Sequence, residues 1–356
     1  MKNSQLKGAL LEFLVRNLMK NCGFNSVVAD NLYTFENLGL FFVNGKGAAH
    51  DADVLMEPPI QIPFTYPYRV LFECKAYGST VGLPVVRSAL GLRYDINEFE
   101  IVTKDSVMQR QNNRRASYAV EARNRYNYQI AVASRGDFSK PAVEFAANNK
   151  IPLLSMKSLL PPQTLSVFAS IDQTYVDTIA EETQDRLYRL FKDRQHGLDA
   201  NGHTEARAYL RNDPKIGKVI SDFREVLDRL FVGLIETGDL IFLYAETDAL
   251  GWLRETRNLT ELRVQIHYYL DQPDVWWLQV FDSVDRNLSA QFRFFLPEMI
   301  VRLWKQYGLE RSRAIDIKAE FFSRIFIFTN RAAQGWPFLT LRLDQRWLDE
   351  LILNRP

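Results

Sequence analysis

The first half of the chain alternates between helix-like and strand-like patterns of apolar positions. Residues 5–21 carry a wide apolar stripe that stops at Gly23, a typical signal for a helix C-terminus. Short apolar runs bounded by turn residues indicate strands. We predict helix 5–21, strands 35–43, 53–56 and 68–76, helix 84–96, strand 129–134, helix 140–149 and strand 151–154. The last three elements form a βαβ unit, which implies a parallel strand pair with a right-handed crossover.

The pattern changes after the dipeptide Pro161-Pro162. Helices are predicted over 172–195 and 215–235, and a series of strand-like runs follows. These runs are 240–244, 263–269, 275–281, 290–295, 321–329 and 338–343. Because the helices between them are short, this half favours an α+β arrangement with an antiparallel sheet. We therefore predict two domains, residues 1–160 and residues 161–356.

Composition narrows the class of protein. The 356 residues are 47% hydrophobic and 24% charged, with two cysteines, Cys22 and Cys74. Two cysteines exclude a disulfide framework and a four-cysteine zinc site, and they fit a reducing compartment. The longest apolar runs have about seven residues, whereas a membrane span needs roughly 20. Glu12 and Arg16 interrupt the apolar stretch near the N-terminus, which argues against a signal peptide. We expect a cytoplasmic protein with no membrane partner.

The net charge of +1 conceals an uneven distribution. Residues 1–160 hold 19 Lys and Arg against 14 Asp and Glu, whereas residues 161–356 have an acidic excess. A local basic excess suggests a polyanionic partner such as DNA, although a solvated helix face has the same composition. Within 112–128, arginine is mixed with Tyr and Asn, which suits contacts to phosphates and bases, although a polar helix would also fit. The candidate DNA contacts there are Arg114, Arg115, Arg123 and Arg125.

Candidate chemistry lies between Asp53 and Lys75. Glu73 and Lys75 close an otherwise apolar strand, where charged side chains are costly without partners or a function. Side chains alternate along a strand, so Glu73 and Lys75 share a face while Cys74 points into a core. Asp53 on the neighbouring strand places a second carboxylate beside Glu73. Two carboxylates and a backbone carbonyl suit Mg²⁺ or Mn²⁺ rather than zinc. The alternative is an ion pair on a solvated strand.

The chain resembles the PD-(D/E)xK nuclease superfamily over about residues 5–157. The resemblance rests on the helix with Glu12, on Asp53-Val54-Leu55 and on Phe72-Glu73-Cys74-Lys75. Val81-Gly82, Val86-Arg87 and residues 134–154 are similar to Mrr-like restriction endonucleases. The resemblance implies an α/β fold with a restriction endonuclease-like αβββαβ core, followed here by a second, α+β domain.

The resemblance also implies roles for individual residues. Asp53, Glu73 and the backbone carbonyl of Cys74 would bind Mg²⁺ or Mn²⁺, and Lys75 would activate or position the attacking water. Glu12 would be an additional metal or water ligand, although an i,i+4 pair with Arg16 on the surface is the alternative. Arg87 is the last candidate residue, and it is interpreted either as a phosphate contact or as an ordinary exposed arginine.

Other positions near the motif keep a more ordinary interpretation. Ala52 stands where the name-giving motif has proline. Asp51 has the strand parity to face the site, but we favour Asp53 because it directly precedes the apolar run. His50 is interpreted as a turn residue, with a catalytic role as the alternative. The tripeptide Asp316-Ile317-Lys318 repeats the D-x-K form without the same strand frame, so no second active site is expected there.

The candidate metal site and the resemblance together imply a Mg²⁺-dependent endonuclease that hydrolyses DNA phosphodiester bonds in restriction of, or defence against, foreign DNA. The alternatives are a non-catalytic nucleic-acid-binding module and a nuclease acting on RNA or branched DNA. Residues 161–356 would then serve recognition, regulation or oligomerisation. Because cutting both strands of DNA usually needs two active sites, we expect a homodimer or transient self-association.

Overall fold

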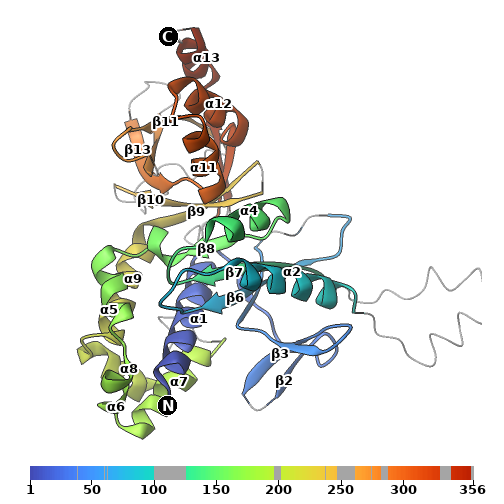
Figure 1. The fold of residues 1–356 in the computed structure, drawn as a ribbon, viewed down its shortest axis with the longest axis vertical. Coiled ribbons are helices and arrows are strands. Elements are labelled where there is room, and N and C mark those ends of the chain that lie inside the picture. The colour runs from blue at the N-terminus through green and yellow to red at the C-terminus, as the bar shows by residue number, and fades with distance from the viewer. Residues whose placement is uncertain are drawn as a thin grey trace, which may run out of the picture.

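Three sheets and the helices that cover them make up the part of the chain described by the computed structural model (Figure 1). That part comprises residues 1–37, 39–59, 61, 63–99, 126–195, 202–236, 238–246, 261–273, 275–281, 288–328 and 338–353. A five-stranded sheet lies in the middle of the molecule, with a closed barrel toward one end of the long axis. A group of helices extends from the sheet toward the other end.

The central sheet mixes antiparallel and parallel strands. In spatial order its strands are β1 (Asn25–Ser26), β5 (Val54–Glu57), β6 (Tyr68–Lys75), β7 (Asn127–Ser134) and β8 (Leu153–Ser155). β5 is antiparallel to β1 and β6, whereas β6, β7 and β8 are parallel to one another. The predicted βαβ unit is present, because helix α4 (Lys140–Asn148) connects the parallel strands β7 and β8.

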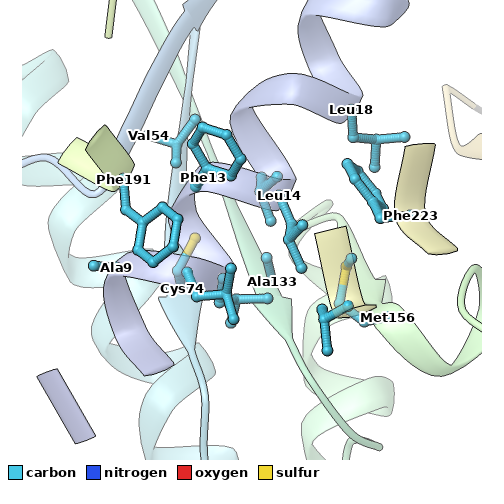
Figure 2. Packing of buried hydrophobic residues seen from close by; sticks show 14 of the residues in the cluster. Ala9, Phe13, Leu14, Leu18, Val54, Cys74, Ala133, Met156, Phe191 and Phe223 are labelled. Atoms are coloured by element: carbon cyan, nitrogen blue, oxygen red, sulfur yellow. The ribbon is translucent and has the colours of Figure 1, made fainter. Parts of the chain in front are cut away.

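Helices cover both faces of this sheet, because its central strands are apolar on both sides. Helix α1 (Asn3–Asn21) packs on one face, where it shares a core with Cys74 and Ala133 (Figure 2). Helix α2 (Leu83–Asn97) and α4 pack on the other face, over Leu71 and Ile130. Cys74 is therefore a buried core residue, and burial raises the pKa of its thiol.

The helices after residue 160 complete the core around α1. They are α5 (Pro162–Ala169), α6 (Gln173–Asp177), α7 (Glu181–Lys192), α8 (Thr204–Asn212) and α9 (Ile216–Arg229), after the short 3-10 turn η1 (Met156–Ser158). The rings of Phe13 on α1 and Phe191 on α7 lie 5.3 Å apart, and Phe223 of α9 joins the same cluster (Figure 2). The single helix predicted over 172–195 is two helices, because Asp172 caps α6 and the chain restarts at Ala180.

A closed seven-stranded barrel forms most of the second half. Its strands are β9 (Leu230–Ile235), β10 (Leu240–Ala245), β11 (Glu261–Tyr268), β12 (Val275–Phe281), β13 (Leu288–Phe295), β14 (Arg324–Phe328) and β15 (Phe338–Leu343). All described pairs are antiparallel except β11 with β15. The helices beside it are α11 (Glu298–Gln306), α12 (Arg311–Phe321) and α13 (Gln345–Leu353). Trp276, Phe292 and Phe294 fill the interior. Across the described residues, no helix is long and apolar enough to cross a membrane.

The predicted fold class is wrong. The chain does not show the expected restriction endonuclease-like αβββαβ core followed by a second, α+β domain, but a closed barrel together with mixed sheets and helices. One reason lies in residues 35–43, predicted as a single strand. Gly39, with a φ of +78°, reverses the chain between β2 (Thr34–Asn37) and β3 (Leu40–Asn44), which form a separate sheet with β4 (Ala49–Asp51).

The second reason concerns the barrel. Alternating apolar positions identify strands, but they do not indicate which strands pair. β9 pairs with both β10 and β14, and this pairing closes the ring that the sequence pattern leaves open.

Candidate active site at the end of strand β6

Asp53 and Glu73 come together where β5 and β6 meet. The strand register pairs Val54 with Phe72, so Asp53, at the bend before β5, lies opposite Glu73. The carboxylate Oδ2 of Asp53 accepts a hydrogen bond of 2.8 Å from the backbone N–H of Cys74. In a strand, the N–H and C=O of one residue point to the same side, so the Cys74 carbonyl also faces the edge beside Asp53.

Lys75 shares a face of β6 with Glu73, as strand alternation requires. Its Nζ donates to Glu73 Oε2 at 3.0 Å, and both side chains are half-buried. Burial alone would lower the pKa of Lys75, but the charge and hydrogen bond of Glu73, together with the charge of Asp53, raise it. Lys75 is therefore a charged ammonium at neutral pH.

Asp53 is the carboxylic acid of this group that has a raised pKa. Burial raises its pKa to about 7, and the neighbouring Glu12 and Glu73 carboxylates act in the same direction. The hydrogen bond from Cys74 and the charge of Lys75 oppose that rise without cancelling it. Because a bound cation would favour the ionised form, an acid of this kind is suited to a site that binds positive charge.

Glu12 lies on α1, is 5% exposed, and its charge acts on Asp53. Lys192, at the end of α7, donates to both of its carboxylate oxygens, at 2.9 and 2.7 Å. Burial raises the pKa of Glu12, and the charge of Lys192 opposes this rise. The surface pair with Arg16 is not found, since Arg16 is itself buried and donates to the carbonyls of Phe191 and Asp193.

Lys192 is a site residue that sequence reasoning missed. It interacts electrostatically with Asp53 as well as with Glu12, and its charge also acts on Asp51 of β4. Burial alone would lower the pKa of Lys192, but the charge and hydrogen bonds of Glu12, together with the charge of Asp53, raise it. The lysine is 180 positions away from Glu12 in the sequence, and no local pattern marks it.

A cleft of about 490 Å³ opens beside Glu73. Its walls come from β4, β6 and α2, and its lining consists of His50, Asp51, Glu73, Ser88, Gly91, Leu92 and Asp95. This volume lies within the range of pockets that hold small ligands. Asp51 therefore faces the site that its strand parity allowed. His50, interpreted from sequence as a turn residue, lies on β4 and contacts Asp95 of α2.

The predicted nucleic-acid contacts fall in two groups. Arg87 is exposed on α2, with its guanidinium 5.8 Å from the ring centre of Phe145 on α4. Arg114, Arg115, Arg123 and Arg125 lie outside the described residues.

The second D-x-K sequence lies in a different setting from the first. Asp316, Ile317 and Lys318 are in helix α12 rather than on a strand, and Lys318 is buried. The Lys318 ammonium lies over the rings of Tyr268 and Trp347, and its pKa is lowered to about 8 by burial. The arrangement of Asp53, Glu73 and Lys75 is not repeated there.

The donor set at β6 fits a hard divalent cation in kind. Asp53 and Glu73 supply carboxylates, and the backbone of Cys74 supplies a carbonyl, all oxygen ligands of the type that Mg²⁺ prefers. Asp53 Oδ1 and Glu73 Oε1 make no hydrogen bond within the described parts of the chain. No group of three or more His, Cys, Asp or Glu side chains arranged to hold a metal is found among the described residues. A cation would therefore depend on two carboxylates, the main chain and water.

Comparisons with known proteins leave the site without a named relative. No known protein family matches the chain, and no curated protein matches it. Among solved structures, the chain is similar to a protein of unknown function, AF1548, at 16% identity and a TM-score of 0.33. The similarity covers 62% of this chain and 98% of that protein.

Proposed function

We propose that the protein is a metal-dependent nuclease that hydrolyses DNA phosphodiester bonds at Asp53, Glu73 and Lys75. The observation that carries the proposal is the convergence of two carboxylates and an ammonium at the end of β6, beside an open cleft. The sequence motif around these residues, similar to that of the Mrr-like restriction endonucleases, supports a role in restriction of, or defence against, foreign DNA.

Each residue of the candidate site would have a separate role. Asp53, Glu73 and the Cys74 carbonyl would hold Mg²⁺ or Mn²⁺. When bound, such an ion supplies an acidified water and stabilises negative charge on a phosphate. Lys75 stays protonated beside Glu73, so it is suited to bind a phosphate oxygen and stabilise the charge developing there. The same charge makes Lys75 better suited to position the attacking water than to remove its proton.

Plasmid cleavage tests the proposal directly. Wild-type protein would be incubated with supercoiled plasmid in Mg²⁺, Mn²⁺ or EDTA, beside Lys75→Ala and a matched control, Lys157→Ala. Lys157 also pairs with a carboxylate, that of Asp137, but at an exposed position away from the cleft. We expect metal-dependent cutting that falls at least about 100-fold in Lys75→Ala and stays unchanged in Lys157→Ala.

Other outcomes distinguish the alternative functions. Binding of DNA without cutting in any metal would favour a non-catalytic module. Cleavage of RNA or of branched DNA in preference to duplex plasmid would move the proposal to those substrates, because the hydrolytic chemistry is the same. Equal loss in both lysine variants would show that the effect does not belong to the β6 site.

A further inference from the structure

His50 and Asp95 form a close pair on the wall of the same cleft. His50 Nε2 and Asp95 Oδ2 are 2.6 Å apart, and the two side chains are 30% and 26% exposed. They come from different elements, β4 and α2. The pair opens on the cleft that Glu73 also lines, so substrate held at Glu73 would lie beside it.

The surrounding backbone holds Asp95 in place. Its second oxygen, Oδ1, accepts from the N–H of Gly47 at 2.8 Å, and its main-chain carbonyl accepts from the N–H of Lys46 at 3.0 Å. A Cβ on Gly45 would lie 2.1 Å from Asp95 Oδ2 and 2.9 Å from His50 Nε2. Only glycine therefore lets this turn approach the pair so closely.

These contacts fix which imidazole nitrogen can act on a substrate. The hydrogen bonds from His50 and Gly47 lower the pKa of Asp95, so its carboxylate is ionised and can only accept. His50 Nε2 must then carry the proton that is donated to Asp95. Nδ1 has no hydrogen bond within the described residues, so it is the nitrogen that can exchange a proton.

The neighbours of His50 leave room for a reacting group. On α2, Ser88 has a small side chain and Gly91 has none, and a Cβ on Gly91 would meet no atom within 4 Å. The charged groups that line the cleft around His50 are Asp51, Glu73 and Asp95, from β4, β6 and α2.

We propose that His50 is the general acid of the nuclease reaction and that Asp95 positions it, a role that rests on the proposed function. As water oxygen bonds to phosphorus, the bond from phosphorus to the leaving oxygen breaks and its electron pair passes to that oxygen. With both ring nitrogens protonated, His50 gives the Nδ1 proton to the leaving oxygen, which departs as a hydroxyl group, and keeps the Nε2 proton that is donated to Asp95. The proton lost by the attacking water passes to solvent, from which Nδ1 is reprotonated. Asp95 is a positioning residue, since it acts only through Nε2.

A substrate that needs no acid tests the assignment. In bis(p-nitrophenyl) phosphate the leaving group departs as a stable anion, whereas the leaving oxygen of DNA needs a proton. Wild type, His50→Gln, Asp95→Asn and Lys75→Ala would be compared on supercoiled plasmid and on this diester, with Mg²⁺ or Mn²⁺. We expect His50→Gln to lose about 100-fold on plasmid and less than about threefold on the diester. Asp95→Asn should show the same selectivity with a smaller loss, and Lys75→Ala should lose activity on both substrates.

The outcomes separate this role from the function on which it rests. Equal losses on the two substrates in His50→Gln, or no loss on either, would overturn the general-acid role while the nuclease stands. A wild-type protein that cleaves neither substrate would overturn the nuclease proposal itself. Asp95→Asn is nearly isosteric, and a melting curve like that of wild type would show that its selectivity does not come from misfolding.

Discussion

At the scale of single residues, the site concentrates charge that the fold must compensate. Glu12 is buried, and Lys192 is the group that neutralises it through two hydrogen bonds. Removing one partner of a buried ion pair leaves the other charge without compensation, which costs more than the pair contributes as a whole. The stability of variants of this pair therefore measures how much Lys192 of α7 contributes to keeping Glu12 buried.

We expect Lys192→Met to lower the free energy of unfolding by about 3 kcal/mol, because it leaves the Glu12 carboxylate buried without a cation. Adding Glu12→Gln to Lys192→Met should recover a large part of this loss. Urea denaturation of the two single variants and the double variant measures the coupling. Additive losses would contradict a direct interaction between the two side chains.

Asp53 gives stability a predictable dependence on pH. Its pKa is 3.8 in the unfolded chain and about 7 in the folded protein. Between these values the folded state holds a proton that the unfolded state has released, so the contribution of Asp53 to stability falls as pH rises from about 4 to 7. Above pH 7 the contribution becomes constant.

Asp53→Asn removes this titration. We expect the stability of the variant relative to wild type to increase steadily from pH 4 to pH 7, measured by denaturation in EDTA. The amide oxygen of the variant side chain can still accept from the Cys74 N–H, so the hydrogen bond to the main chain is retained. A difference that is flat across this pH range would mean that Asp53 ionises normally in the folded protein.

At the scale of elements, α8 and α9 meet without space between them. A Cβ on Gly217, in the first turn of α9, would lie 1.9 Å from the carbonyl oxygen of Leu210 on α8. Gly8 on α1 has no atom within 4 Å of the same position. The position of Gly217 therefore has no room for a side chain, whereas the position of Gly8 does.

We expect Gly217→Ala to lower the free energy of unfolding by about 2 kcal/mol, because α8 must move away. Gly8→Ala should raise it by up to about 1 kcal/mol, since alanine is the better helix former. Thermal denaturation of both variants compares the two effects. A neutral Gly217→Ala would show that α8 can shift without cost.

The sequence predicts the part of the candidate site whose residues lie close together along the chain. Strand alternation placed Glu73 and Lys75 on one face, and the adjacent strand brought Asp53 beside them, within about twenty positions along the chain. Lys192 and Asp95 were missed because each reaches its partner through packing between distant elements. The hairpin at Gly39 and the closure of the barrel were missed for the same reason, since both depend on pairing that apolar periodicity does not encode.

At the scale of the whole molecule, one core crosses the predicted boundary at residue 160. Leu14 and Leu18 of α1 share a buried cluster with Phe191 of α7 and Phe223 of α9 (Figure 2). Residues 1–160 alone would expose this face of α1 to water.

We expect residues 1–160 to lack a cooperative unfolding transition when produced alone, because the apolar face of α1 would have no cover. Residues 1–229, which keep α5 to α9, should show more helical structure and resist proteolysis better. Circular dichroism melting compares the two fragments. A cooperative transition in 1–160 at the temperature of the full chain would restore that boundary as a domain limit.

Strand β9 belongs to two cores at once. Leu230 and Val232 lie in the cluster around α1, while Phe231 and Ile235 lie in the barrel interior, and α9 ends at Arg229 with no linker before the strand. The outer face of β10 also contacts the first cluster, through Leu240 and Phe242. The barrel is thus not a module that recombination could exchange for another, because a crossover at this junction would have to satisfy two sets of packing with alternate residues of a single strand. The two halves are therefore expected to be inherited as one piece.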